Sequence, residues 1–186
     1  MGSDGFKPRQ IDDLTGFYRG VVIENDDPDQ FGRIQVNVFG VFDGITSADL
    51  PWAKPAFPVF SGAGDGYGFF GVPEIGSHVW CFFEVGDLYQ PCFFAEAPTG
   101  VHGLPTERTT NYPDRKVWRT KNGLVLILDN SAKEIYVNHP DGSSIKIGTA
   151  GDITVTGGDI TVTGDAISIT GGGAVVIEGG TVSINP

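Results

Sequence analysis

The chain has 186 residues, a formal net charge of −11 and a pI of about 4.5. Acidic residues outnumber basic ones in both halves, 14 against 5 in residues 1–98 and 9 against 7 in residues 99–186. A nucleic-acid partner is not expected, because binding a phosphate backbone requires cationic side chains that displace its counterions. The N-terminus lacks the pattern of a signal peptide, and no apolar run reaches the roughly 18 residues that span a bilayer. The sequence predicts a protein made in the cytoplasm.

The first half of the chain predicts a small β-barrel. Residues 1–16 are polar and aperiodic, which predicts an N-terminal arm, and residues 40–68 are rich in proline and glycine, which predicts loops. Short β-prone stretches bounded by turn residues predict strands at 17–23, 33–39, 69–72, 77–85 and 89–96. Five short strands without a helical period are typical of a small closed or partly closed barrel.

The second half begins with a proline- and threonine-rich segment at 99–116, which predicts an extended linker. Apolar and β-branched residues return after it and predict strands at 124–128, 134–138 and 144–147. From about residue 151 the sequence consists almost entirely of Gly, Thr, Ile, Val, Asp, Ser and Ala. This change in composition separates a terminal segment from the rest of the chain.

The terminal segment is an internal repeat. The heptapeptide Gly-Asp-Ile-Thr-Val-Thr-Gly occupies 151–157 and again 158–164, and degenerate copies follow. β-branched residues alternate with polar ones at period two, and glycine closes each copy, so the pattern predicts short strands with tight turns rather than a coiled coil.

Such repeats are not expected to be stable in a single chain. One apolar pair per short strand is too little for a solenoid this thin, and its strand edges would stay open. Three copies wound about one axis would close the core and pair the strands between chains. The sequence therefore predicts an obligate homotrimer, with a needle core made of Ile153, Val155, Ile160, Val162, Ile167, Ile169, Val175, Ile177, Val182 and Ile184.

Taken in chain order, these features resemble the central spike family of contractile tails, which includes baseplate assembly protein V-type phage spikes and the valine-glycine repeat proteins of type VI secretion. The family's opening strand corresponds to 17–22, its Asp-Pro turn to 25–28 and its Gly-Arg-hydrophobic strand to 32–36. The loop that crosses the barrel corresponds to 50–53, the closing hairpin to 73–87 and the start of the needle to 118–123. The resemblance implies an all-β protein with an N-terminal OB-fold barrel at 17–98 and a C-terminal triple-stranded, intertwined β-helix at 117–186.

The resemblance also implies a function. A spike of this family is a structural part of a phage tail baseplate, sits on the hub at the end of the tail tube and pierces the outer envelope of the target cell. We therefore expect a homotrimer in the virion that contacts the hub protein and, transiently, the outer membrane. No enzymatic activity and no cofactor are expected.

Two departures from the family pattern concern the needle. Some relatives carry a lysozyme domain between barrel and needle, and the 99–116 linker leaves no room for one. Others end in a His-x-His motif that binds iron, and no histidine lies in the terminal repeats. We expect a blunt apex or, with slight preference, an apex closed by a separate PAAR-type tip protein.

Other readings remain open from the sequence. A carbohydrate- or receptor-binding module could use the loops of 40–68, and a cell-wall hydrolase is a more remote alternative. A phage is not distinguished from a tailocin or another contractile injection system.

Several residue groups allow a chemical role beside a structural one. Three aspartates recur at similar positions in the repeats; they are Asp152, Asp159 and Asp165. In a trimer they could form rings of carboxylates that bind cations, but a role as solvent-exposed turn residues is favoured. The histidines show no metal-ligand spacing; they are His78, His102 and His139. Cys81 and Cys92 are expected to be buried thiols on adjacent strands. The tryptophans are expected to be core or interface anchors rather than a sugar platform; they are Trp52, Trp80 and Trp118.

Overall fold

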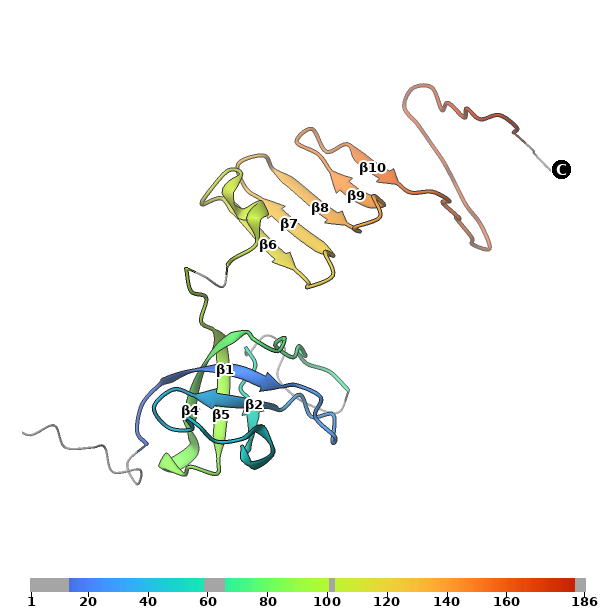
Figure 1. The fold of residues 1–186 in the computed structure, drawn as a ribbon. Coiled ribbons are helices and arrows are strands. Elements are labelled where there is room, and N and C mark those ends of the chain that lie inside the picture. The colour runs from blue at the N-terminus through green and yellow to red at the C-terminus, as the bar shows by residue number, and fades with distance from the viewer. Residues whose placement is uncertain (1–13, 59–65, 101–102, 183–186) are drawn as a thin grey trace, which may run out of the picture.

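A computed structural model describes residues 14–58, 66–100 and 103–182 (Figure 1). The fold is all-β, with three short 3-10 helices, η1 (Ser47–Asp49), η2 (Glu84–Gly86) and η3 (Thr106–Thr109). The first five strands are β1 (Tyr18–Glu24), β2 (Ile34–Val38), β3 (Trp52–Pro55), β4 (His78–Phe83) and β5 (Pro91–Glu96). The next five are β6 (Arg115–Arg119), β7 (Val125–Asp129), β8 (Glu134–Asn138), β9 (Ser144–Ile147) and β10 (Ile153–Thr156).

The first five strands close into a barrel in the order β1-β2-β3-β5-β4. All neighbours are antiparallel except β3 and β5, which are parallel. Alternate residues of each strand face the interior, so that Ile34, Val36 and Val38 of β2 are almost fully buried. The predicted barrel is thus confirmed and is consistent with an OB-fold.

Two sequence predictions about the barrel are wrong. The strand expected at 69–72 is not one, because these residues pack as an aromatic cover: the rings of Phe69 and Phe70 lie 5.9 and 6.0 Å from that of Phe57. The missing barrel strand is β3, inside the predicted loop segment 40–68 and overlapping the motif assigned to a crossing loop. Pro51 and Pro55 weaken the strand signal in its sequence, because proline is rare inside strands. Its few ladder pairs are all with strands distant in sequence.

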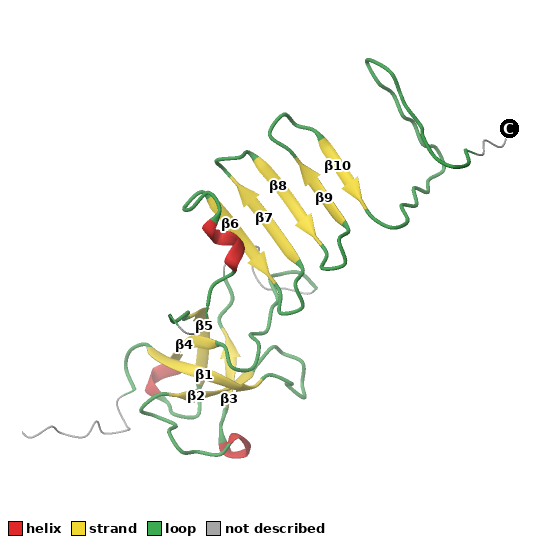
Figure 2. Cartoon of the chain, turned by 45° about the horizontal axis from the view of Figure 1, so that its top comes forward, coloured by secondary structure: helices red, strands yellow, loops and turns green. Residues whose placement is uncertain are grey.

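The remaining strands form a second sheet, a meander in the order β10-β9-β8-β7-β6, with every pair antiparallel. Figure 2 shows this sheet standing beyond one end of the barrel. An ion pair of 3.4 Å between Lys121 Nζ and Glu74 Oε2 joins the β6–β7 turn to a barrel loop. Residues 157–182 carry no strand in the single chain. The triple-stranded β-helix therefore stays a prediction.

No helix among the described residues is long and apolar enough to cross a membrane.

Closure of the barrel predicts that Gly20 on β1 tolerates no side chain. A Cβ there would lie 2.4 Å from Val36 Cγ1 and 2.7 Å from the Asn37 carbonyl oxygen, both on the neighbouring strand β2. We expect Gly20→Ala to destabilise the barrel by about 1–3 kcal/mol through overpacking, measured by urea unfolding. Gly71→Ala is the matched control, since its Cβ would meet only Phe69 at an ordinary 3.7 Å. Equal stability of the two variants would contradict the close packing at β1.

Candidate assembly face

The ladder register of the second sheet places apolar side chains in two rows on one face. Across the sheet, Trp118 pairs with Leu126, Leu126 with Val137, Val137 with Ile145, and Ile145 with Val155. The second row runs through Lys116, Leu128, Ile135, Ile147 and Ile153. Because paired residues in a ladder share a face, all ten side chains project to the same side.

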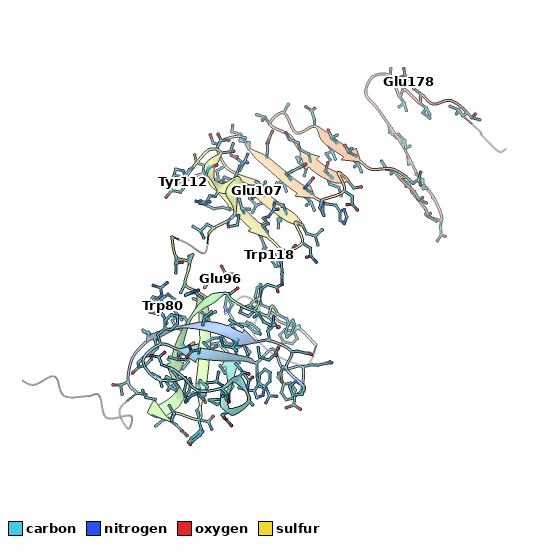
Figure 3. All side chains as sticks on the ribbon, in the orientation of Figure 1. Trp80, Glu96, Glu107, Tyr112, Trp118 and Glu178 are labelled. Atoms are coloured by element: carbon cyan, nitrogen blue, oxygen red, sulfur yellow. The ribbon has the colours of Figure 1, made fainter. Side chains whose placement is uncertain are left out.

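These side chains are bare in the single chain. We call the apolar face the nine residues Trp118, Leu126, Leu128, Ile135, Val137, Ile145, Ile147, Ile153 and Val155, whose exposed fractions run from 36% to 71%. A continuous exposed apolar surface of this kind marks an interaction site. Figure 3 shows Trp118 at the end of β6 nearer the barrel, so the apolar face starts next to the barrel and runs away from it.

The opposite face of the sheet is mixed in character, and the chain itself covers the part formed by β6 and β7. Residues 103–114, here called the strap, lie along β6 and contain η3. Arg115 Nη1 donates to the Glu107 carbonyl oxygen at 3.4 Å, and the Glu107 carboxylate also pairs with Arg119. Under this cover Val125 and Ile127 are only 6% exposed. The strap thus leaves one face of the sheet available for a partner.

A buried carboxylate fastens the strap to the sheet. Asp129 Oδ2 accepts hydrogen bonds from Arg115 Nε at 2.7 Å and from Asn111 Nδ2 at 3.0 Å, and Oδ1 accepts one from the Ala132 amide at 2.8 Å. The Ala132 amide first, then Arg115 and Asn111, lower the pKa of Asp129 to about 2. Asp129 therefore remains ionised through the range in which most carboxylates titrate.

The ten residues predicted for the needle core fall into three groups. Ile153 and Val155 lie on β10 and join the apolar face, opposite Ile147 and Ile145. Ile184 lies outside the described residues. The remaining seven lie in 157–182, are at least half exposed and are not brought together within one chain.

The part of this face contributed by β6 to β9 was not predicted from the sequence. The omitted residues are Trp118, Leu126, Leu128, Ile135, Val137, Ile145 and Ile147. Their signal was present in 134–138 and 144–147, where apolar residues recur at period two, whereas 124–128 is apolar throughout and no strand was predicted over β6. Strand alternation alone does not say whether an apolar row faces the chain's own core or a partner.

A hydrogen-bonded polar cluster of the barrel lies in the turn before β2, which the sequence indicated only as a turn. Asp27 accepts hydrogen bonds from the amides of Asp29, Phe31 and Arg33 and pairs with the Arg33 guanidinium at 2.5 Å. The pKa of Asp27 is held far below its usual range, chiefly by Arg33. Arg33 also lies 5.7 Å from the centres of the Phe31 and Trp52 rings. This group fixes the turn and is separate from the apolar face.

The two cysteines are buried and free, as predicted. Cys81 pairs with Phe93 and Cys92 with Phe82, so the thiols lie on adjacent strands but point to opposite faces. Burial raises the pKa of Cys81 to about 12 and that of Cys92 to about 11. Neither thiol is set up to react at neutral pH.

The other candidate residues are dispersed. Trp52 and Trp80 are half-buried on barrel strands beside Arg33 and Arg19, whereas Trp118 is 62% exposed on β6. His78 is on β4, His139 follows β8, and His102 lies outside the described residues. Among described residues no group of three His, Cys, Asp or Glu side chains could hold a metal ion.

The closed five-stranded barrel, followed by a meander with a bare apolar face, defines a modular all-β protein with an OB-type domain. Residues 18–96 match the family model of the type VI secretion system/phage-baseplate injector OB domain. This match to the barrel supports a relationship to the baseplate spike family. No curated protein matches the sequence.

The Asp129 cluster predicts a pH-dependent contribution to stability. The pKa of Asp129 is lowered from 3.8 to about 2, so the stabilisation is fully present above about pH 4 and is lost as the pH falls towards 2. We expect Asp129→Asn to be less stable than the wild type in thermal unfolding at pH 7, with the difference narrowing between pH 4 and pH 2.

Asp141→Asn is the control, because the Asp141 side chain is 86% exposed in the β8–β9 turn. It should leave the melting temperature nearly unchanged. A difference between wild type and Asp129→Asn that stays constant down to pH 2 would show that ionisation of Asp129 does not hold the strap.

Proposed function

We propose that the chain is the central spike of a contractile-tail baseplate, in which three copies join through the apolar face and form a rigid needle that pierces the target envelope. The observation that carries the proposal is the bare apolar face on a sheet that follows an injector OB domain. A match to an injector OB domain supports a position at the baseplate, and the sheet would supply the assembly surface.

The chemistry of the apolar face favours further copies of the same chain as its partners. Eight of its nine residues are Leu, Ile or Val, and the polar groups in the two rows, the Trp118 indole and the Lys116 ammonium group, both lie on β6. An aliphatic surface of this kind can pack against further copies of itself, and heterologous contacts that close after three copies form a ring. With two residues per strand it is narrow, which suits one wall of a three-sided prism whose walls meet at a common axis.

The repeats beyond β10 support the same arrangement. Residues 157–182 are β-prone, exposed and without a ladder partner in the single chain. Backbone amides and carbonyls are strongly driven to pair, and strands of the same short repeat in two other chains match them in length and chemistry. Threonine and aspartate would then face water around a core of isoleucine and valine.

A shaft built in this way suits a mechanical role. Cross-paired strands leave few segments that can open locally, so bending requires many hydrogen bonds to break together. The barrel would sit on the hub protein at the end of the tail tube, and the repeats would point towards the target outer membrane. A separate tip protein of the PAAR type could close the apex.

The trimer predicts a sharp effect of a charge on the apolar face. Val137, at the centre of the face, would be buried in the trimer, so Val137→Asp should place three unpaired carboxylates at its core and prevent association. Light scattering should give about three times the chain mass of 19.8 kDa for the wild type and one chain mass for the variant.

Ser144→Asp adds the same charge on the polar face of the neighbouring strand β9 and should remain trimeric. Contractile particles carrying Val137→Asp should lose the ability to permeabilise target outer membranes, whereas those with Ser144→Asp should keep it. A monomeric wild type, or a Val137→Asp chain that stays trimeric, would rule out the proposed interface.

A further inference from the structure

The repeats cannot by themselves align three chains. Residues 151–157 and 158–164 are identical in sequence, so moving one chain by one repeat exchanges Ile153 and Val155 for Ile160 and Val162. Strands whose pattern repeats are prone to register slips, because the shifted pairing buries the same side chains. A shaft made of such repeats needs a register signal from elsewhere in the chain.

Each strand of the sheet contributes two side chains to the rows, a pair that we call a level, and one level differs from the other four. Four of the five strands contribute a pair of aliphatic residues: Leu126 and Leu128, Ile135 and Val137, Ile145 and Ile147, and Ile153 and Val155. The first strand, β6, contributes Trp118 and Lys116 instead. These are the single aromatic and the single charged side chain in the two rows of the described sheet. Lys116 Nζ is directed to the strap, where it donates to the Pro113 carbonyl oxygen at 2.8 Å.

The strand pairings of the sheet all form within a single chain. Every strand from β6 to β10 finds its ladder partners within its own chain, through turns of four or five residues. The Asp129 cluster and the strap brace its other face. Each chain therefore presents the two rows as a preformed surface, whereas residues 157–182 have no ladder until copies meet.

We propose that the level formed by Trp118 and Lys116 sets the register of the three chains, so that the identical repeats beyond it pair in one alignment. This inference rests on the trimeric spike proposed above. In register, three indole rings share one level at the barrel end of the shaft, and each Lys116 keeps its contact with the Pro113 carbonyl oxygen.

A slipped chain would break this arrangement in two ways. It would set the Lys116 ammonium group against an aliphatic level of its neighbours, where burial of an unpaired charge is costly. It would also force Trp118 into a space filled by leucine or isoleucine in the other chains, which overpacks that level. The four aliphatic levels resemble one another and would oppose the slip only weakly.

The test uses the full-length chain with Thr161→Cys in the second repeat, spin-labelled for pulsed EPR. The label is selective because Cys81 and Cys92 are at most 4% exposed, with pKa values raised to about 12 and 11. With only the label mutation, we expect a trimer with one narrow distance distribution. In the Lys116→Leu, Trp118→Leu double variant, which makes all five levels aliphatic, we expect a mass of three chains and a distribution split into two or more populations.

The matched control is the Leu126→Val, Leu128→Val double variant, which changes the next level and leaves the first intact; it should keep one narrow distribution. A Lys116→Leu, Trp118→Leu trimer with a single narrow distribution would overturn the inference while leaving the trimeric spike standing. Monomers of that variant would also overturn it, since the first level would then supply association rather than register. A monomeric chain with only the label mutation would contradict the trimer itself.

Discussion

The antiparallel ladder from β6 to β10 is the constraint on which the rest of the second domain depends. Side chains alternate sides along a strand, so a shift of one residue at any of its four pairings would scatter the apolar rows over both faces. The observed register instead aligns Leu, Ile and Val strand after strand, from Leu126 on β7 to Val155 on β10. Turns of four or five residues, several of them containing glycine, preserve this phase.

A second constraint determines which face remains bare. The strap covers the side that carries Val125 and Ile127. It is held there by the Asp129 carboxylate, whose pKa is lowered to about 2, so that it remains ionised in mildly acidic solution. Because Asp129 is bound to groups from the strap, β6 and the β7–β8 turn, one side chain ties together three segments of chain. In the barrel, Asp27 has a similar role, since it accepts backbone hydrogen bonds and pairs with Arg33 in the turn before β2.

The two parts of the chain solve the problem of open sheet edges differently. The barrel pairs all its edges internally and buries its own core around Ile34 and Val38, so it is self-sufficient. The meander keeps two edges and one bare face, and the repeats beyond it have no ladder at all in a single chain. A barrel that is stable alone and a remainder that is not are what the proposed spike requires, since its barrel would dock and the remainder would assemble.

The sequence by itself determined the all-β class, the barrel, most strand positions and the glycine-bounded repeat, because period-two alternation and turn residues are local signals. It did not locate β3, whose prolines hide a strand held by partners distant in sequence. It predicted the strands that carry Leu126 and Val137 but not their common face, since the side to which an apolar row points depends on ladder register and on the strap. Only the tertiary structure decided that the strap covers Ile127 and leaves Trp118 exposed, because that choice depends on long-range contacts that no local pattern encodes.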